Sequence, residues 1–216
     1  MSIEHHLERA FWTPVIVADM PDHARIAPEL EATILARYEE APGLPADGGW
    51  QSDLKLLEWG GPAALAVRDA AIELAEMHTA DTREGREGEK RGWASMAWAN
   101  ICGDGTYNRP HVHGDAYWTA VYYVRVDPGE GGELVLHDPR LPALEMHAPR
   151  LRFRPNGGEG AINSPPEAGM LLLFPGWLSH SIAPYSGGGL RISMAMNLAA
   201  RFGPAVELDP TVRRTA

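Results

Sequence analysis

Apolar residues recur every three to four positions in two stretches near the start of the chain, which predicts two amphipathic helices. The first stretch carries Ile26, Leu30, Ile34, Leu35 and Tyr38. The second begins at residues 60–62, Gly-Gly-Pro, because proline suits the first turn of a helix, and it continues to residue 77. A strand is predicted over residues 11–19, and loops are predicted over residues 42–49 and 82–91.

From Gly92 onward the pattern changes to short apolar or alternating runs separated by Gly, Pro, Asn and Asp. Runs of this kind predict short strands, and many of them in succession are typical of a β-sandwich or jelly roll. The predicted strands are 93–101, 116–126, 133–137, 151–154, 170–174, 180–183 and 191–198. We therefore expect a mixed α+β fold dominated by β structure. Residues 1–91 supply an N-terminal strand and helices that pack on a β core of residues 92–216, as one structural domain overall.

Composition limits the class of protein. Of the 216 residues, 44% are hydrophobic and 22% are charged, as in ordinary soluble domains. The net charge of −10 disfavours a broad polyanion-binding surface, so no nucleic-acid partner is expected. The single cysteine, Cys102, excludes an intrachain disulfide and fits a reducing cytoplasm. We expect neither a signal peptide nor a membrane span, because no basic segment precedes an apolar run and no apolar stretch has the necessary length.

Three histidines are candidate metal ligands. His111 and His113 are one residue apart, and His180 follows 67 residues later. Side chains alternate along a strand, so a His-x-His pair on a strand directs both imidazoles to the same face. A third histidine from a distant strand completes a facial set of ligands and leaves metal positions open for other molecules. Imidazole suits iron, zinc, copper and nickel, so the residue type alone does not choose the metal.

Short motifs accompany these histidines in a fixed order. They are Trp98-x-Asn100, Gly105, Asn108, His111-x-His113, Thr119-Ala120-Val121-Tyr122-Tyr123-Val124, Gly132-Glu133-Leu134, Asp138-Pro139-Arg140, Gly169-x4-Phe174-Pro175-x-Trp177-x2-His180 and Arg191-Ile192-Ser193-x3-Asn197. The ordered set resembles a bacterial and phage family of 2-oxoglutarate/Fe(II)-dependent oxygenases and, more distantly, the prolyl-hydroxylase-like members of that superfamily. The resemblance covers residues 93 to 200, about half of the chain.

The resemblance implies a fold, two cofactors and a reaction. The fold is a double-stranded β-helix, a cupin-like jelly roll that holds Fe(II) with 2-oxoglutarate bound to the metal. The distal carboxylate of 2-oxoglutarate would meet Arg191 and Ser193, since a guanidinium fork matches a carboxylate. Tyr123 stands where relatives often direct a hydroxyl to the co-substrate, and packing in the barrel core is the alternative explanation. The implied reaction is oxidation of a further substrate, most often hydroxylation, with release of succinate and CO₂ and no catalytic residue beyond the metal site.

One departure from the superfamily leaves the ligand set open. Most relatives have His-x-Asp or His-x-Glu, whereas this chain has His111-Val112-His113. The surrounding motifs fit best when His111 is the first ligand, which gives a site of three histidines: His111, His113 and His180. The alternative pair, His113 and Asp115, would restore two histidines and one carboxylate.

Two other functions remain open at this point. A cupin-type metalloenzyme that does not use 2-oxoglutarate would also have His-x-His and a later histidine. It would usually add a glutamate soon after the pair, and none lies between His113 and Pro128. A jelly roll that binds a metal or a small acid without turnover is the other alternative. The prime substrate, a small molecule or a peptide, is not identified, and the helical third either packs on the core or forms a homodimer contact.

Overall fold

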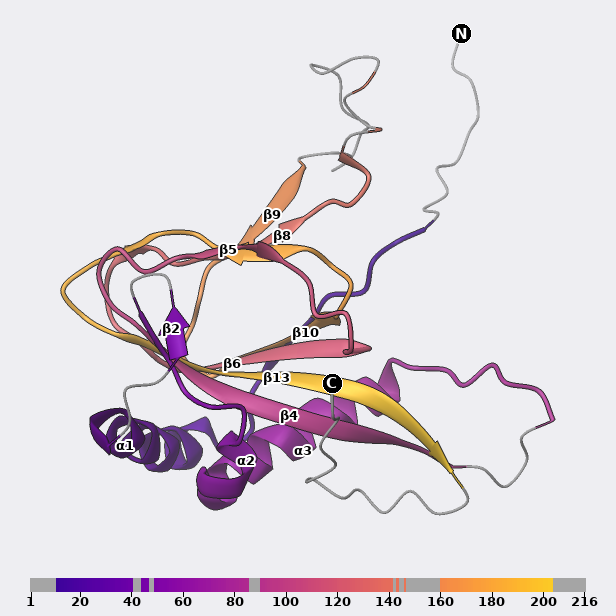
Figure 1. Ribbon diagram of the computed structural model, residues 1–216, viewed down its shortest axis with the longest axis horizontal. Coiled ribbons are helices and arrows are strands. Elements are labelled where there is room, and N and C mark those ends of the chain that lie inside the picture. Colours follow the sequence, from indigo (N-terminus) through magenta and orange to yellow (C-terminus); the bar gives the residue numbers. More distant parts are fainter. Residues whose placement is uncertain are drawn as a thin grey trace, which may run out of the picture.

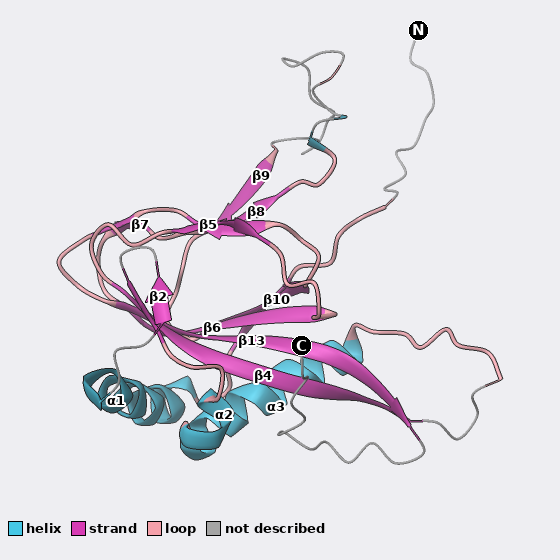
Figure 2. Cartoon of the chain, viewed as in Figure 1, coloured by secondary structure: helices cyan, strands magenta, loops and turns pink. Residues whose placement is uncertain are grey.

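The computed structural model describes residues 11–40, 44–46, 49–85, 90–141, 143, 146 and 160–203. These residues form three layers (Figure 1). Helices cover one face of a seven-stranded sheet, and a four-stranded sheet lies over its other face. The three helices are α1 (His23–Glu40), α2 (Leu56–Trp59) and α3 (Gly61–Met77), drawn in cyan in Figure 2. Among the described residues, no helix has both the length and the apolar character needed to cross a membrane.

The seven-stranded sheet has the order β1-β10-β6-β13-β4-β3-β2, and all neighbouring strands are antiparallel. The strands are β1 (Ile16–Asp19), β2 (Leu44–Ala46), β3 (Gly49–Gln51), β4 (Lys90–Cys102), β6 (Trp118–Val126), β10 (Met170–Pro175) and β13 (Arg191–Gly203). The long strands β4 and β13 pair along their whole length. Strands from the N-terminal and C-terminal parts of the chain therefore share one sheet.

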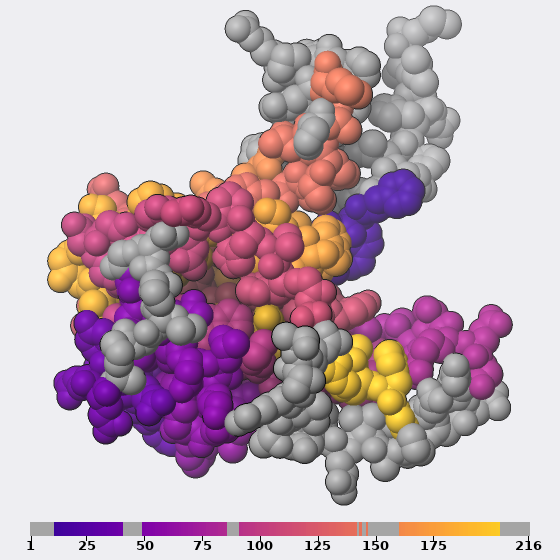
Figure 3. Space-filling view, viewed as in Figure 1, coloured from indigo at the N-terminus to yellow at the C-terminus, as the bar shows by residue number. Residues whose placement is uncertain are grey.

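The four-stranded sheet has the order β5-β11-β8-β9. Its strands are β5 (Asn108–His111), β8 (Leu134–His137), β9 (Ala161–Ser164) and β11 (His180–Ile182). A separate pair consists of β7 (Glu130–Gly131) and β12 (Tyr185–Ser186). The hairpin of β8 and β9 projects from the body of the molecule (Figures 1 and 3).

The central strands are buried on both faces, which explains their continuous apolar sequences. Along β10, Leu171 and Leu173 pack with the helices, whereas Leu172 and Phe174 pack toward the smaller sheet. Strand β6 alternates in the same way, with Tyr122 in the helix-side core. The larger sheet thus has an apolar face for the helices and a second face that is free to carry a site.

The mixed α+β, strand-rich fold expected from the sequence is confirmed, with differences at several elements. Residues 11–15 do not belong to the first strand, because β1 begins at Ile16. Residues 44–46 form β2 rather than a loop, since they pair with β3. Lys90 and Arg91 begin β4 rather than ending a loop. The predicted strand over residues 151–154 lies outside the described residues.

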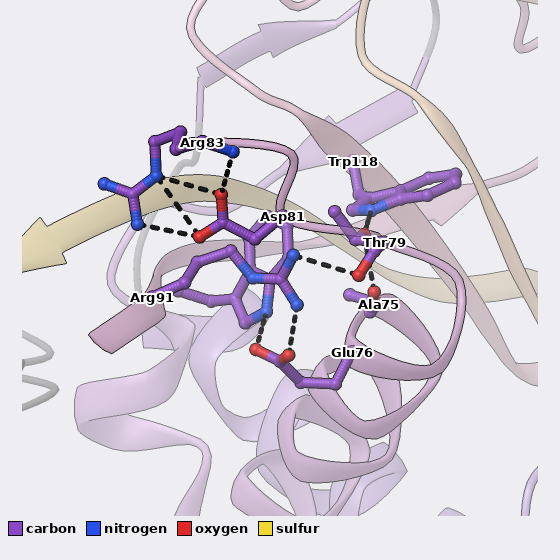
Figure 4. Close-up of polar contacts among 8 residues, drawn as sticks. Ala75, Glu76, Thr79, Asp81, Arg83, Arg91 and Trp118 are labelled. Atoms are coloured by element: carbon purple, nitrogen blue, oxygen red, sulfur yellow. Dashed lines mark hydrogen bonds and ion pairs between the residues drawn. The ribbon is translucent and has the colours of Figure 1, made fainter. Parts of the chain in front are cut away.

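A polar cluster joins the end of α3 to the larger sheet (Figure 4). Glu76 accepts hydrogen bonds from the Arg91 guanidinium and from Nε1 of Trp93, the latter at 2.6 Å. Arg91 also donates to the backbone oxygen of Thr79 at 3.0 Å, and Nε1 of Trp118 donates to the Thr79 hydroxyl at 2.8 Å. The cluster satisfies the polar edges of two buried indoles, so it fixes how α3 sits on β4 and β6.

Replacing Glu76 with alanine is expected to destabilise the fold by about 1–3 kcal/mol, because the buried Trp93 N–H loses its acceptor. Chemical denaturation in urea measures this loss directly. Glu73→Ala is the matched control on the exposed side of the same helix, and it should change stability by less than about 0.5 kcal/mol. Equal effects of the two substitutions would contradict the role given to Glu76.

Candidate metal centre

The structure brings His111, His113 and His180 together. His111 ends β5 and His180 begins β11, and the two residues are direct partners in the antiparallel register. One ring nitrogen from each histidine lies within 4.8 Å of the others. The ring centroids are 5.1 Å apart for His111 and His113, 4.3 Å for His111 and His180, and 5.1 Å for His113 and His180. This is the spacing of side chains that can share one metal ion.

His113 reaches this group by a route that the sequence pattern did not predict. The expectation placed both residues of the His-x-His pair on one strand, but β5 ends at His111. His113 lies in the turn that follows, where its backbone N–H donates to the carbonyl of Gly176 at 2.8 Å. A hydrogen bond to the turn before β11, rather than strand alternation, therefore brings the second imidazole to the first.

Backbone carbonyls orient two of the three rings. Nδ1 of His111 lies 2.7 Å from the carbonyl oxygen of Arg109, and Nδ1 of His180 lies 2.9 Å from that of Leu178. A carbonyl only accepts hydrogen bonds, so each Nδ1 carries the proton. Nε2 of both rings is then left with a free lone pair, which is the form that binds a metal.

The surroundings of His113 and His180 keep these two rings neutral. Burial lowers the pKa of His113 to about 4, and the neighbouring His111 lowers it further. Burial likewise lowers the pKa of His180 to about 4, against the opposing effect of its hydrogen bond to Leu178. Phe174 packs edge-on against His180 at 4.8 Å and contributes to this apolar surrounding. At neutral pH both imidazoles are therefore unprotonated and available as ligands.

The three histidines open into a cavity of about 340 Å³ between the two sheets. Its floor consists of alternate residues of two paired strands, because side chains alternate between the faces of a sheet. These residues are Met96, Trp98, Asn100 and Cys102 from β4 and Arg191, Ser193, Ala195 and Asn197 from β13. The residues between them, such as Ile192 and Met194, face the helices. The predicted metal ligands and the predicted carboxylate-binding pair thus share one cavity.

Arg191 is a buried cation without a carboxylate partner in the described part of the chain. It is 2% exposed, and it forms no salt bridge with any residue that the structure describes. One of its terminal nitrogens donates to Sγ of Cys102 at 3.1 Å, and its Nε has no hydrogen-bond partner among the described residues. Burying an unpaired charge is costly, so this guanidinium is suited to an anion that enters the cavity. Ser193, 3% exposed, adds a hydroxyl on the same face of the strand.

Tyr123 lies next to Arg191 but is not among the residues that line the cavity. Its side chain is fully buried, and the Arg191 guanidinium lies 5.7 Å from the centre of its ring. Burial raises the pKa of Tyr123, against the lowering effect of the Arg191 charge. Its hydroxyl has no partner among the described residues. The phenol is therefore protonated and has hydrogen-bonding capacity unused.

The remaining candidates lie outside the histidine group. Asp115 is exposed in the turn after His113 and is not part of the cluster of ligand atoms. His137 contacts the Ser181 hydroxyl at 2.9 Å, and His23 contacts the Tyr122 hydroxyl at 2.7 Å. In the described part of the chain, the group of three histidines is the set of His, Cys, Asp and Glu residues that could hold a metal ion.

Sequence reasoning missed two parts of the site. Strand β3 contributes Trp50 and Gln51 to the cavity wall, although the predicted loop ended at residue 49 and no element was predicted for these two residues. Asn197 contacts His113, with its amide nitrogen 3.4 Å from Nδ1. The spacing of Arg191, Ser193 and Asn197 at odd positions of one strand was a signal that could have placed Asn197 in the site.

Comparison with known families identifies the segment that carries the site. Residues 96–197 match the model of a family described as "Putative 2OG-Fe(II) oxygenase". The matched segment contains the three histidines, Arg191 and Ser193. No curated protein matches the chain.

Three solved structures illustrate the similarity of fold. The nogalamycin-biosynthesis epimerase SnoN has 15% identity and a TM-score of 0.63, with 94% of this chain and 87% of that chain covered. A prolyl-4-hydroxylase from Pseudomonas putida has 17% identity and a TM-score of 0.56, with coverage of 88% and 94%. HygX from Streptomyces hygroscopicus, solved with nickel and 2-oxoglutarate, has 12% identity and a TM-score of 0.57, with coverage of 87% and 83%. The expected double-stranded β-helix fold is confirmed by these likenesses.

Proposed function

We propose that this chain, whose residues 96–197 belong to the 2OG-Fe(II) oxygenase family, is a non-haem oxygenase that uses Fe(II) and 2-oxoglutarate to oxidise a further substrate. The observation that carries the proposal is one cavity that contains three clustered imidazoles and a buried arginine with no carboxylate partner among the described residues. A cupin-type metalloenzyme without 2-oxoglutarate would give this arginine no anion to bind.

The residues present fit both cofactors. His111, His113 and His180 would hold iron through one ring nitrogen each, and burial lowers the pKa of both His113 and His180 so that these two rings are neutral at physiological pH. Arg191 and Ser193 would bind the distal carboxylate of 2-oxoglutarate, since a guanidinium fork and a hydroxyl suit its oxygens. The bound pair supplies the oxidising chemistry, in which 2-oxoglutarate is decarboxylated to succinate. The protein's contribution is to orient both groups and to surround them with apolar walls.

Tyr123 is proposed as a secondary contact of the co-substrate. Its buried hydroxyl lacks a partner among the described residues, and it neighbours Arg191. Because it lies behind the cavity lining, it would reach the co-substrate only after a small shift of the lining residues. Tyr123→Phe should therefore weaken 2-oxoglutarate binding less than any substitution of Arg191.

Succinate formation tests the proposed function. The protein is purified without oxygen and mixed with Fe(II) and 2-oxoglutarate, and a weak visible absorption band of their chelate is expected. Admission of oxygen should then yield succinate even without a prime substrate. Metal binding with neither the band nor succinate would contradict the proposal and favour a metalloprotein that does not use 2-oxoglutarate.

The choice between three histidines and the pair His113 and Asp115 is tested by iron content. We propose the three-histidine set, supported by the clustering of its ligand atoms. His111→Ala should lose the metal, whereas Asp115→Ala, which changes an exposed residue, should retain it. Loss of iron in the Asp115 variant alone would overturn this ligand set.

The prime substrate is proposed to be uncharged where it enters the cavity. Among the described residues that line the cavity, Arg191 is the only Arg, Lys, Asp or Glu, and it is assigned to 2-oxoglutarate. The wall formed by β3 and β4 presents indole, thioether and amide groups from Trp50, Gln51, Met96 and Asn100. A small molecule or a peptide segment with apolar and amide or hydroxyl groups suits this surface. A cytoplasmic location and a homodimer remain predictions from the sequence.

A further inference from the structure

Asn197 contacts His113 from the floor of the cavity, and we propose that it is a positioning residue that keeps Nε2 of His113 free to bind the metal. The inference rests on the proposed metal site and adds a residue to it. Its basis is the difference between the hydrogen-bond partners of the three histidines. Two rings are oriented by backbone carbonyls, whereas the third meets a side-chain amide.

The side-chain amide of Asn197, unlike a backbone carbonyl, is compatible with a proton on either nitrogen of the His113 ring. The carbonyls of Arg109 and Leu178 only accept, so they require a proton on Nδ1 of His111 and His180. An amide presents an N–H₂ donor on one side and a C=O acceptor on the other. With Nδ2 of Asn197 toward His113 the amide donates to Nδ1, the proton lies on Nε2, and Nε2 cannot bind a metal. With Oδ1 of Asn197 toward His113, the amide oxygen accepts a hydrogen bond from Nδ1–H. Nε2 then carries no proton and is free to bind a metal.

Thr119 allows the amide to take either orientation. Its hydroxyl lies 3.3 Å from Oδ1 of Asn197 and can donate to that oxygen. After a half-turn of the amide, the same hydroxyl can accept from Nδ2, because a hydroxyl both donates and accepts. Neither orientation therefore leaves the second amide atom without a partner. The half-turn that frees Nε2 of His113 requires no other hydrogen bond to be lost.

The surrounding strands hold both residues in place. Asn197 lies on β13 between Met96 of β4 and Thr119 of β6, in the middle of the larger sheet. The ring of His113 packs on Trp98, with 5.7 Å between ring centroids. Because the backbone of Asn197 and the plane of His113 are fixed in this way, rotation of the amide is the adjustment that remains. Metal binding and the amide orientation are thus coupled.

Two substitutions of Asn197 separate this role from simple packing. Asn197→Asp offers only acceptors and always favours the metal-binding form of His113, whereas Asn197→Leu has a similar size and no hydrogen-bonding atom. With Co(II) alone as the probe, the leucine variant should bind about 10- to 100-fold more weakly, as when an outer partner of a ligand is lost. The aspartate variant should bind at least as tightly as the original protein. Asn100→Leu is the control, since Asn100 lines the same cavity without a hydrogen bond to the three histidines among the described residues.

A second measurement follows the proton itself. In the Zn(II)-loaded protein, the Nδ1 proton of His113 should exchange slowly with solvent in the original protein and in Asn197→Asp, and rapidly in Asn197→Leu. Equal Co(II) affinity in all variants would overturn the inference, as would equal weakening of the aspartate and leucine variants. Failure of the unmodified protein to bind Co(II) would instead remove the metal site on which the proposed function depends.

Discussion

Replacing His180 with alanine is expected to abolish iron binding and to reduce succinate formation to the level of a protein-free control. His180 is the most deeply buried of the three proposed ligands, with 4% of its surface exposed, and it lies on β11 between β5 and β8. No described Asp, Glu, Cys or His outside the group is close enough to replace it. Loss of a direct ligand should cost more than the roughly 10- to 100-fold that is typical of outer partners. Metal analysis of the purified variant and a succinate assay measure both effects.

His137→Ala is the matched control for this prediction. His137 is on the adjacent strand β8 and contacts the hydroxyl of Ser181, the residue next to His180, but it is outside the ligand group. This variant should keep its iron and its succinate formation, so it separates a direct ligand from a nearby histidine of the same sheet. Retention of stoichiometric iron by His180→Ala would show that the cluster is not the metal site.

The central strands were predictable because burial on two faces leaves a strong signal. Residues 170–174 and 116–126 are nearly continuous apolar runs, and the structure makes them β10 and β6 in the middle of the larger sheet. The hydrophobic pattern did not predict strand β5, because Asn108-Arg109-Pro110-His111 has no strand pattern of its own, and only the His-x-His spacing pointed to a strand there. Its extended form comes from pairing with β11, a contact between segments about 70 residues apart.

The site shows the same difference between features that local sequence indicates and features that depend on contacts between distant segments. The spacing of His111 and His113 and the apolar strand around Arg191 indicated the proposed metal ligands and the proposed anion-binding arginine from local sequence. The contact between Asn197 and His113 depends on β13 lying beside β6 and on the turn that positions His113, so no local pattern contains it. Local patterns therefore indicated the proposed ligands and the arginine. The packing of distant strands decided which groups orient them.

The second large effect concerns Arg191. Arg191→Leu is expected to raise the KM for 2-oxoglutarate by about 30-fold to several thousand-fold, because truncating one partner of a buried charge pair costs about 2–5 kcal/mol. At saturating 2-oxoglutarate the kcat should fall much less, since Arg191 would bind the end of the molecule far from the reacting carbons. Initial rates of succinate formation at varied 2-oxoglutarate give both constants. Ser193→Ala should raise the KM less. The loss of one neutral hydrogen-bond donor is equivalent to about 0.5–1.5 kcal/mol of binding free energy.

Thermal unfolding separates this binding role from a structural one. Without 2-oxoglutarate, Arg191 is a buried cation with no carboxylate partner among the described residues, so replacing it with the apolar residue leucine should leave the Tm unchanged or raise it. Added 2-oxoglutarate with Fe(II) should raise the Tm of the unmodified protein, because a ligand that binds only the folded state stabilises it by mass action. The variant should show little of this rise at the same concentration. A variant that unfolds several degrees earlier without ligand, yet has an unchanged KM, would make Arg191 a structural residue and leave the cavity without an assigned anion.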